Sequence, residues 1–197
     1  MLPRTKSLGF TLIELMVTIA VLAIIMGIAV PSFMSTIVNA RLTTAANDLL
    51  AAIQLTRTEA IRTHGRVTLC KATPTANQCD TSAASDWGRG WMVFTDPVTQ
   101  SPPQVEGTSR IVSRGGGQLS SDLSIKSGAT DLQLYISFTG DGSSRQMNGN
   151  FLAGTIRICS SSSFVGNDDR ARDIVINSAG RATIQRPTGL PASCPAP

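Results

Sequence analysis

Apolar residues are concentrated near the start of the chain. Between Phe10 and Val30 the sequence is FTLIELMVTIAVLAIIMGIAV, in which Glu14 is the only charged side chain. As a helix this stretch would extend roughly 31 Å, about the thickness of the hydrocarbon core of a bilayer. The short segment before it carries Arg4 and Lys6. Because basic flanks stay in the cytoplasm, the pattern predicts a single span that places the rest of the chain across the membrane.

The helical pattern resumes after Pro31. Apolar residues recur at helical spacing along one narrow face, at Leu42, Ala45, Ala46, Leu49, Ile53 and Ala60. No proline interrupts this pattern, and Gly65 is a natural C-cap. We therefore expect one helix from about Thr11 to about His64, roughly 80 Å long, with a membrane anchor in its first half and a globular head on its second. A coiled coil over Asn39–Ile61 is the alternative, but its Ala-rich face lacks a sustained heptad.

Beyond Gly65 the pattern changes to that of strands. Short β-branched or aromatic runs, bounded by Gly, Pro, Ser and Asp, lie at Arg66–Lys71, Gly90–Thr95, Arg110–Val112, Leu132–Phe138, Gly154–Cys159, Asp173–Asn177 and Arg181–Gln185. The last two predict a hairpin with Gly180 at its turn. Strands and helices do not alternate, so we expect antiparallel sheets and the α+β class. The stretches Thr95–Gly107 and Ser160–Arg170 are expected to be exposed loops.

The apolar run has two competing interpretations. A cleaved secretory signal would use Gly27–Ala29 as its small-x-small site, but Glu14 is out of place in such a segment and Pro31 would lie close behind the cut.

A carboxylate near the bilayer interior costs about 2.5–3.5 kcal/mol and is by default a functional candidate with a partner. If the chain is cut between Gly9 and Phe10, the new α-amine lies one helical turn from Glu14. That amine could then neutralise Glu14 of a neighbouring subunit. The alternative for Glu14 taken alone is a side chain that snorkels to the edge of the membrane.

Composition narrows the classes of function. His64 is the only histidine in 197 residues, which argues against histidine-based metal sites and a Ser–His–Asp triad. Its place beside Gly65 suggests a cation at the helix end. The formal net charge of +4 permits an acidic partner without requiring one. No motif assembles a nucleophile, a base and oxyanion donors, so we expect neither an enzyme nor a cofactor nor a bound metal ion.

Several other motifs have structural interpretations. Asp141, Asp168 and Asp169 lie near glycines but lack EF-hand spacing, so solvated turns are expected rather than a calcium site. Trp87 and Trp91 flank Gly-Arg-Gly and could stack on a ligand. We favour a structural role for both, with Trp91 buried on a strand and Trp87 covering an edge.

The four cysteines are Cys70, Cys79, Cys159 and Cys194. A single span would place them in an oxidising periplasm, where an even number of cysteines indicates two disulfides; zinc would require closer Cys-x-x-Cys spacing. Three pairings are open, and we favour Cys70–Cys79 with Cys159–Cys194. The second bridge would tie down the proline-rich tail Arg186–Pro197.

The string GFTLIE, from Gly9 to Glu14, resembles the processing site of type IV pilins and type II secretion pseudopilins. The likeness includes the short basic leader, the Gly before the cut, the Phe after it and the Glu five residues in. Pro31 also falls where many pilins carry a helix-weakening proline. In that family a prepilin peptidase cleaves after the Gly and methylates the new amine. The resemblance thus implies processing at Gly9 and Phe10 and an assembly role for Glu14.

The head resembles the GspH/FimT/FimU group of minor pilins and pseudopilins, in which a long helix packs on two β-sheets. The matching stretches are RTEAIR (57–62), VTLC (67–70), WGRGWMVFTD (87–96) and SAGR (178–181). On this basis the chain divides into a cleaved leader (1–9), a transmembrane or filament-core half-helix (10–31), an amphipathic half-helix on the head (32–64) and an antiparallel β head with a tail (65–197).

The resemblance implies a minor pilin that helps to initiate assembly at or near the tip of a type IV pilus. An H-type minor pseudopilin of the type II secretion system is the alternative. In either role the chain would be a single-pass protein of the bacterial inner membrane, with a periplasmic head, before it joins a filament. Its partners would be other pilins or pseudopilins and the prepilin peptidase.

A DNA-binding pilin for natural transformation is a second alternative. FimT-type DNA binding is associated with a C-terminal Gly-Arg-x-Arg element, which here is Gly180, Arg181 and then Thr183 in place of the second Arg. Alternate residues of a strand share a face, so Arg181 and Thr183 should point together and Arg186 to the other side. So few cations would bind phosphate weakly, and DNA is therefore a partner we do not favour.

Overall fold

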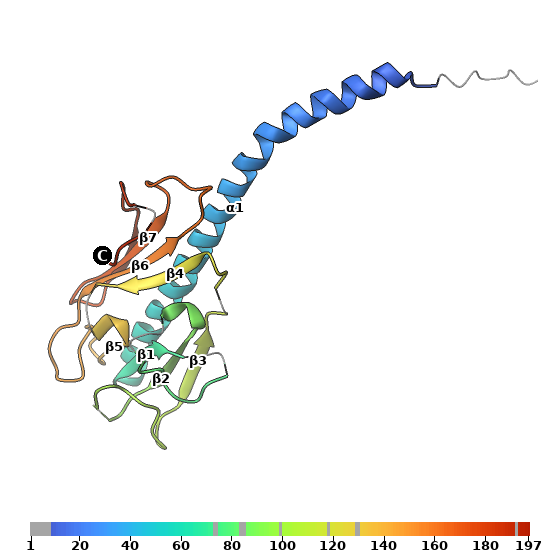
Figure 1. The fold of residues 1–197 in the computed structure, drawn as a ribbon. Coiled ribbons are helices and arrows are strands. Elements are labelled where there is room, and N and C mark those ends of the chain that lie inside the picture. The colour runs from blue at the N-terminus through green and yellow to red at the C-terminus, as the bar shows by residue number, and fades with distance from the viewer. Residues whose placement is uncertain are drawn as a thin grey trace, which may run out of the picture.

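The computed structural model describes residues 9–72, 75–82, 86–98, 100–117, 119–128, 131–191 and 193–197. One long helix, α1 (Leu12–Thr63), extends well beyond a head in which it is covered by two β-sheets (Figure 1). Thr11 caps the start of α1, where its side chain accepts the backbone N–H of Glu14 at 3.3 Å. The helix therefore runs as one element through the position of Pro31, as the pattern predicts.

The helix ends differently from the prediction. His64, not Gly65, adopts the left-handed conformation, with φ of 51°, and the N–H of Gly65 donates to the carbonyl of Ala60 at 3.3 Å. Close packing against this helix end requires a glycine at Gly140, where a Cβ would lie 2.7 Å from the carbonyl carbon of His64. The loop after the fifth strand thus passes directly against the end of α1.

Two four-stranded sheets follow the helix. The first has the order β3-β2-β1-β5 and contains β1 (Val67–Lys71), β2 (Trp91–Thr95), β3 (Ile111–Gly115) and β5 (Tyr135–Phe138). The second has the order β4-β6-β7-β8 and contains β4 (Leu123–Ser127), β6 (Gly154–Ser160), β7 (Ala171–Ile176) and β8 (Ala182–Gln185). Every pairing is antiparallel, which confirms the α+β class.

The middle of the chain departs most from the sequence pattern. The pattern missed β4, because its run LSIKS offers only Leu123 and Ile125 as apolar residues among serines. The predicted strand Leu132–Phe138 is divided into a 3-10 turn, η2 (Asp131–Gln133), and β5. Leu132 is fully buried in that turn, so its apolar character reflects packing and not extended backbone.

Two local predictions are corrected. Trp87 lies in the 3-10 turn η1 (Trp87–Arg89), where it is 1% exposed and donates its indole N–H to the carbonyl of Leu132 at 3.0 Å, so it is a core residue and not an edge cover. The loop 160–170 is not wholly exposed. Arg170 is buried beneath it and donates to the carbonyls of Ser160 and Val165, because the loop needs an internal donor to close on itself.

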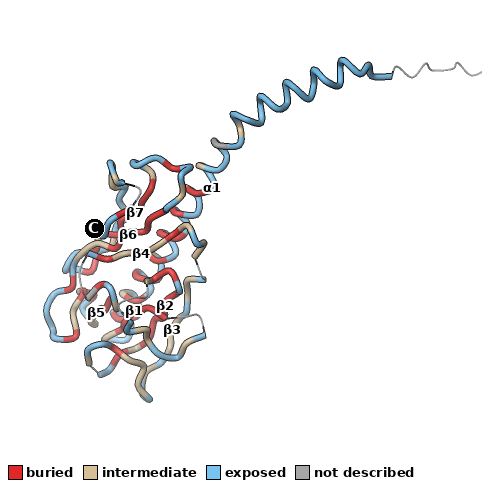
Figure 2. The backbone as a smooth tube through the Cα atoms, viewed as in Figure 1, coloured by how far each residue is buried: buried red, intermediate tan, exposed pale blue. Residues whose placement is uncertain are grey.

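The hydrophobic core lies between the second half of α1 and both sheets. Leu42, Leu49 and Ile53 of the helix are at most 1% exposed, and they pack with Ile136 of β5 and Ile174 of β7. Figure 2 shows the contrast along the helix, which has buried residues only where it lies within the head and is mostly exposed over the described residues of its first half. The core therefore fixes one half of the helix and leaves the other half free of the head.

Candidate functional site

The first half of α1 carries a bare apolar surface. Phe10 is 80% exposed and Ile28 is 75% exposed, and the first buried apolar residue of the helix is Val38. An 18-residue window of the helix has a mean hydropathy of 2.6, and none of that window is buried. By length and composition this segment can cross a membrane. A surface that is apolar on every side needs a lipid or protein environment around it.

Glu14 lies in the first turn of this bare segment. Its side chain is exposed and, among the residues that the structure describes, it takes part in no ion pair. Gly9 and Phe10 precede the helix and are also exposed. The three residues singled out from the sequence thus lie together at one end of the molecule, with the Gly9–Phe10 peptide bond outside the helical hydrogen-bond ladder.

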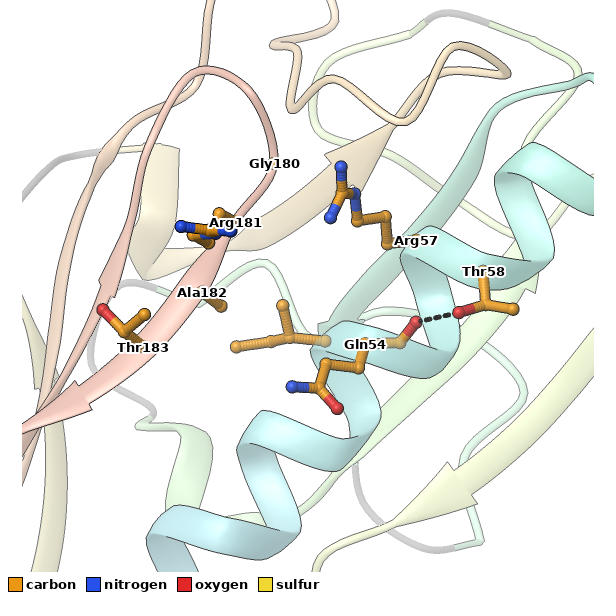
Figure 3. A pocket seen from close by; sticks show the side chains of 8 residues that line it. Gln54, Arg57, Thr58, Gly180, Arg181, Ala182 and Thr183 are labelled. Carbon is orange, nitrogen blue, oxygen red and sulfur yellow. Dashed lines mark hydrogen bonds between the residues drawn. The ribbon is translucent and has the colours of Figure 1, made fainter.

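A groove separates α1 from the β7–β8 hairpin (Figure 3). It encloses about 410 Å³ and is lined on the helix by Ile53, Gln54, Arg57 and Thr58 and on the hairpin by Gly180, Arg181, Ala182 and Thr183. Figure 3 shows Gln54 and Arg57 facing the strand across the gap. Arg181, Ala182 and Thr183 all line this groove, so its lining does not test the prediction that Arg181 and Thr183 share one face of the strand.

Arg57 holds the hairpin against the helix. Its Nε donates to the carbonyl of Gly142 at 3.0 Å, and its Nη2 donates to the carbonyl of Ala179 at 3.2 Å. The turn of the hairpin closes through a hydrogen bond from the backbone N–H of Gly180 to the carbonyl of Asn177. Gly180 has φ of 76°, a conformation that favours glycine. In the sequence, Arg57 lies on the polar face of the predicted helix and within the stretch RTEAIR (57–62). No local motif marks its contacts, which lie 85 and 122 residues away.

Glu59, in the same stretch, forms a small ion-pair cluster. Its carboxylate accepts Arg62 at 2.6 Å and Arg110 at 2.5 Å. The hydrogen bond from Arg62 and the charges of both guanidinium groups lower the pKa of Glu59, against the opposing effect of burial. The cluster joins the end of α1 to the start of β3, so this part of the family pattern holds the fold together.

Arg186 lies apart from Arg181. It lines a second cavity, of about 220 Å³, together with Thr43, Ala46, Asn47, Arg172, Ile184 and Gln185. Its guanidinium is 3.5 Å from Asp169 in an exposed ion pair. The two arginines considered for DNA therefore line different cavities.

Two disulfides bind the head, and they join the pairs that we favoured among the three open pairings. One joins Cys70 in β1 to Cys79, and the other joins Cys159 in β6 to Cys194 in the tail. The tail is held a second time by Arg157, whose Nη1 donates to the carbonyl of Pro195 at 3.0 Å.

Two aspartates have shifted pKa values of opposite sign. Asp96 is 1% exposed at the end of β2, and burial raises its pKa to about 6 despite a hydrogen bond from Thr68. Hydrogen bonds from Thr139 and Ser143 lower the pKa of Asp141 to about 2 in an exposed turn. Over the residues that the structure describes, no three metal-ligating side chains gather at one place.

Comparison with known families matches two parts of the chain. The family model described as type II transport protein GspH matches residues 45–180. The model described as the prokaryotic N-terminal methylation motif matches residues 4–30, which include Gly9, Phe10 and Glu14. No curated protein matches the chain.

Comparison with solved structures finds the same fold. Two crystal forms of the type IV minor pilin FimU from Pseudomonas aeruginosa strain PAO1 are similar to this chain at 23% and 22% identity, each with a TM-score of 0.50. Each match covers 77% of this chain, and 90% and 94% of the respective FimU chains.

The matched regions coincide with the two parts of the molecule. The methylation motif covers most of the bare half-helix, whereas the other match covers most of the buried half and the sheets up to the turn of the hairpin. Residues 31–44 in the middle of the helix and residues 181–197 at the end of the chain lie outside both matches. This chain belongs to the type II transport protein GspH family and carries the N-terminal methylation motif of prokaryotic pilin-like proteins.

Proposed function

We propose that this chain is a minor pilin of a type IV pilus, a structural subunit and not an enzyme, which helps to initiate assembly at or near the tip. The observation that carries the role of a filament subunit is the bare half of α1, which continues without a break into a head whose core is already complete. Such a half-helix can exchange a lipid environment for the apolar helices of other subunits. Before assembly it would anchor the chain in the bacterial inner membrane, with the head in the periplasm.

The proposal includes processing by a prepilin peptidase between Gly9 and Phe10. The scissile bond is exposed and precedes the first helical residue, Leu12, so a peptidase can reach it without unwinding α1. Intact-mass measurement of the membrane-extracted protein tests this step. A chain that begins with methylated Phe10 is expected, whereas one that begins at Met1 or after Ala29 would contradict it.

In the filament, Glu14 would accept the α-amine of Phe10 from a neighbouring subunit. Glu14 has an exposed carboxylate in an apolar surface, and a charge in that setting is costly unless a partner neutralises it. The amine that processing creates is a cation, and it lies one helical turn from Glu14 along the same helix. A neighbouring subunit shifted by about one turn would therefore bring its amine to the depth of Glu14. Assembly would thus provide a charged partner that Glu14 does not have among the described residues of a single chain.

Deletion of the chromosomal copy tests the role of the chain. We expect few or no surface pili on the deletion strain and their recovery when the full chain is restored. Protein export by any type II secretion system in the same cells should be unchanged. Normal piliation together with a loss of exported proteins would contradict the pilus role.

An H-type minor pseudopilin of a type II secretion system is the second candidate. The observation that favours it is the match of residues 45–180 to the family described as type II transport protein GspH. The bare half-helix serves both filaments equally, so the physical argument does not separate them. The deletion phenotype does separate them, because the two filaments perform different tasks.

A further inference from the structure

Arg172 is a buried cation without a carboxylate partner. It lies in β7, is 3% exposed, and donates from Nη1 to the carbonyls of Asp169 at 3.1 Å and Ala171 at 2.8 Å. Its Nη2 donates to the side-chain oxygen of Asn39 at 3.3 Å. All three acceptors are uncharged. Over the residues that the structure describes, no carboxylate oxygen lies within 4 Å of this guanidinium.

Two other arginines of the head, Arg157 and Arg170, are also buried, and their acceptors differ from those of Arg172. Arg157, on the adjacent strand β6, forms a two-pronged ion pair with Asp173 at 2.7 and 2.8 Å. Arg170 uses carbonyl acceptors, but these belong to the loop that encloses it. Arg172 instead lines an open cavity. A buried charge is costly unless it is paired, so this arrangement leaves a site for an external anion.

The cavity has the size and the donors of a small anion site. It encloses about 220 Å³ between α1 and β8, with Asn47 on the helix side, Gln185 and Arg186 on the strand side, and Arg172 of β7 also in its lining. Among the described residues, no Asp or Glu lines it. Two guanidinium groups and two carboxamides can therefore donate to the same ligand, and guanidinium groups bind carboxylates with favourable geometry.

The two arginines also affect each other. Burial lowers the pKa of Arg172, and the charge of Arg186 lowers it further. Asp169 opposes this effect, but its contact with Arg186 is a 3.5 Å pair between half-exposed groups, which gives little stabilisation. An anion placed between Arg172 and Arg186 would relieve their repulsion.

We infer that this cavity, lined by Arg172, Arg186, Asn47 and Gln185, is a docking site for an acidic side chain of a neighbouring subunit in the filament. The inference rests on the proposed function, because it requires a neighbour. It adds a contact on the head to the contacts made by the bare half-helix.

The position of the cavity favours a protein partner. Thr43, which lines the cavity, follows Val30, the last residue of the apolar run, by about 20 Å along the helix, so lipid headgroups are out of reach before assembly. Thr43 and Asn47 belong to the part of the buried half of α1 that is near the bare half, so a subunit packed along the bare half would lie next to the cavity. The volume accommodates one carboxylate side chain, not the width of a nucleic-acid duplex.

The first test is a charge reversal in the full chain, expressed in the cells that assemble the filament. We expect Arg186→Glu to lower recovery in sheared filaments about tenfold, with an unchanged amount in the membrane, because a charged hydrogen bond becomes a repulsion. The conservative Arg186→Lys should retain most of the recovery. Arg114→Glu, an equal change on the exposed edge strand β3, is the matched control and should have no effect.

The second test detects the carboxylate directly. In Arg186→Lys the new amine allows a carbodiimide to join it to a carboxylate in contact, and we expect a cross-link to an Asp or Glu of another subunit, identified by mass spectrometry. The same treatment of Arg114→Lys should give no such product. A cross-link only to Asp169 of the same chain would overturn the inference.

The outcomes separate this inference from the proposed function. Absence of the wild-type chain from every filament would overturn the filament role and the docking site with it. Normal recovery of Arg186→Glu, with the wild type present in filaments, would overturn the docking site alone. Normal recovery together with a loss of bound duplex DNA would assign the cavity to phosphate and would also overturn the inference.

Discussion

The two halves of α1 are one continuous helix in opposite surroundings. Leu49, in the second half, is fully buried against the sheets, whereas Leu22, in the first half, is 53% exposed. The second half has an apolar stripe with polar residues around it, and the first half is apolar on all sides. A helix with one apolar stripe can bury that stripe against a single sheet face, whereas a helix that is apolar on all sides needs apolar neighbours in every direction. The difference shows that folding of the chain is complete in one half and that the other half awaits assembly.

The strongest test of this comparison is the charge in the bare half. Glu14→Ala should leave the head folded and the protein in the membrane, but lower its recovery in filaments about a hundredfold, as expected from the cost of leaving the neighbour's α-amine unpaired. Glu14→Gln, which keeps the shape but not the charge, should behave like the Ala variant. Asp48→Ala, on the exposed face of the second half, is the control. Normal recovery of the Glu14 variants would remove the assembly role of this residue.

A matched pair of leucines tests the head. Leu49→Ala should destabilise the head by about 2–5 kcal/mol, because it opens a cavity in a closed core. Leu22→Ala removes the same atoms from the bare half and should leave the unfolding transition of the head unchanged. Near-UV circular dichroism of the detergent-solubilised chain during thermal unfolding would measure both. Equal effects of the two variants would show that the halves are not independent.

The disulfides sharpen the comparison within the head. They close loops of 35 and 9 residues, for which the chain-entropy model predicts about 3.8 and 2.7 kcal/mol respectively. A double variant of Cys159 and Cys194 to Ala should therefore lower the melting temperature of the head more than a double variant of Cys70 and Cys79. Reduction of the wild type should lower it at least as far. An unchanged transition in reductant would show that the bridges do not stabilise the head.

Asp96 predicts a pH dependence that belongs to the head alone. Its pKa in the folded chain, about 6, lies above the ordinary value of 3.8, so the folded state holds its proton more tightly than the unfolded state. The contribution of this group should therefore make the head more stable as pH falls from about 6.5 to about 4. Asp96→Asn should abolish this part of the profile and raise stability at pH 7.5 by about 1–2 kcal/mol. A wild-type profile that falls with decreasing pH over this range, and that the variant does not change, would contradict it.

The smallest expected effect concerns DNA. The head, residues 35–197, should bind duplex DNA no better than micromolar near 0.15 M salt, because Arg181 and Arg186 lie in separate cavities. Thr183→Arg should strengthen binding several-fold by placing a second cation beside Arg181 in the groove. A fluorescence titration over a salt series, with Arg181→Ala as control, would measure it. Tight wild-type binding that is lost in Arg181→Ala would favour the DNA receptor.

Much of the outline of the molecule was accessible from periodicity. The helix, seven of the eight strands and the hairpin around Gly180 follow from local patterns, because those elements have clear apolar spacing and turn residues. The errors occur where local chemistry is ambiguous. The serine-rich β4 has only Leu123 and Ile125 to mark it, and Leu132 lies in a turn that tertiary packing buries.

The candidate site divides in the same way. Gly9, Phe10 and Glu14 are contiguous along the chain, so a short motif identifies them. The groove beside Arg181 and the cavity beside Arg186 depend on Arg57 and Arg172. Both of these arginines have acceptors that lie far away along the chain, at Gly142 and Ala179 for Arg57 and at Asn39 for Arg172. No spacing rule relates Arg172 to Asn39, which lies 133 residues away.

The sequence by itself determined which half of α1 needs a partner, because an apolar run with one carboxylate is a property of consecutive residues. Only the tertiary structure decided which arginines are neutralised within the head and which are not. A charge is paired or unpaired according to distances between strands, and those distances arise when the sheets close on the helix. Arg157 and Arg172 are alike in sequence, but one meets Asp173 across a strand pair and the other opens into a cavity.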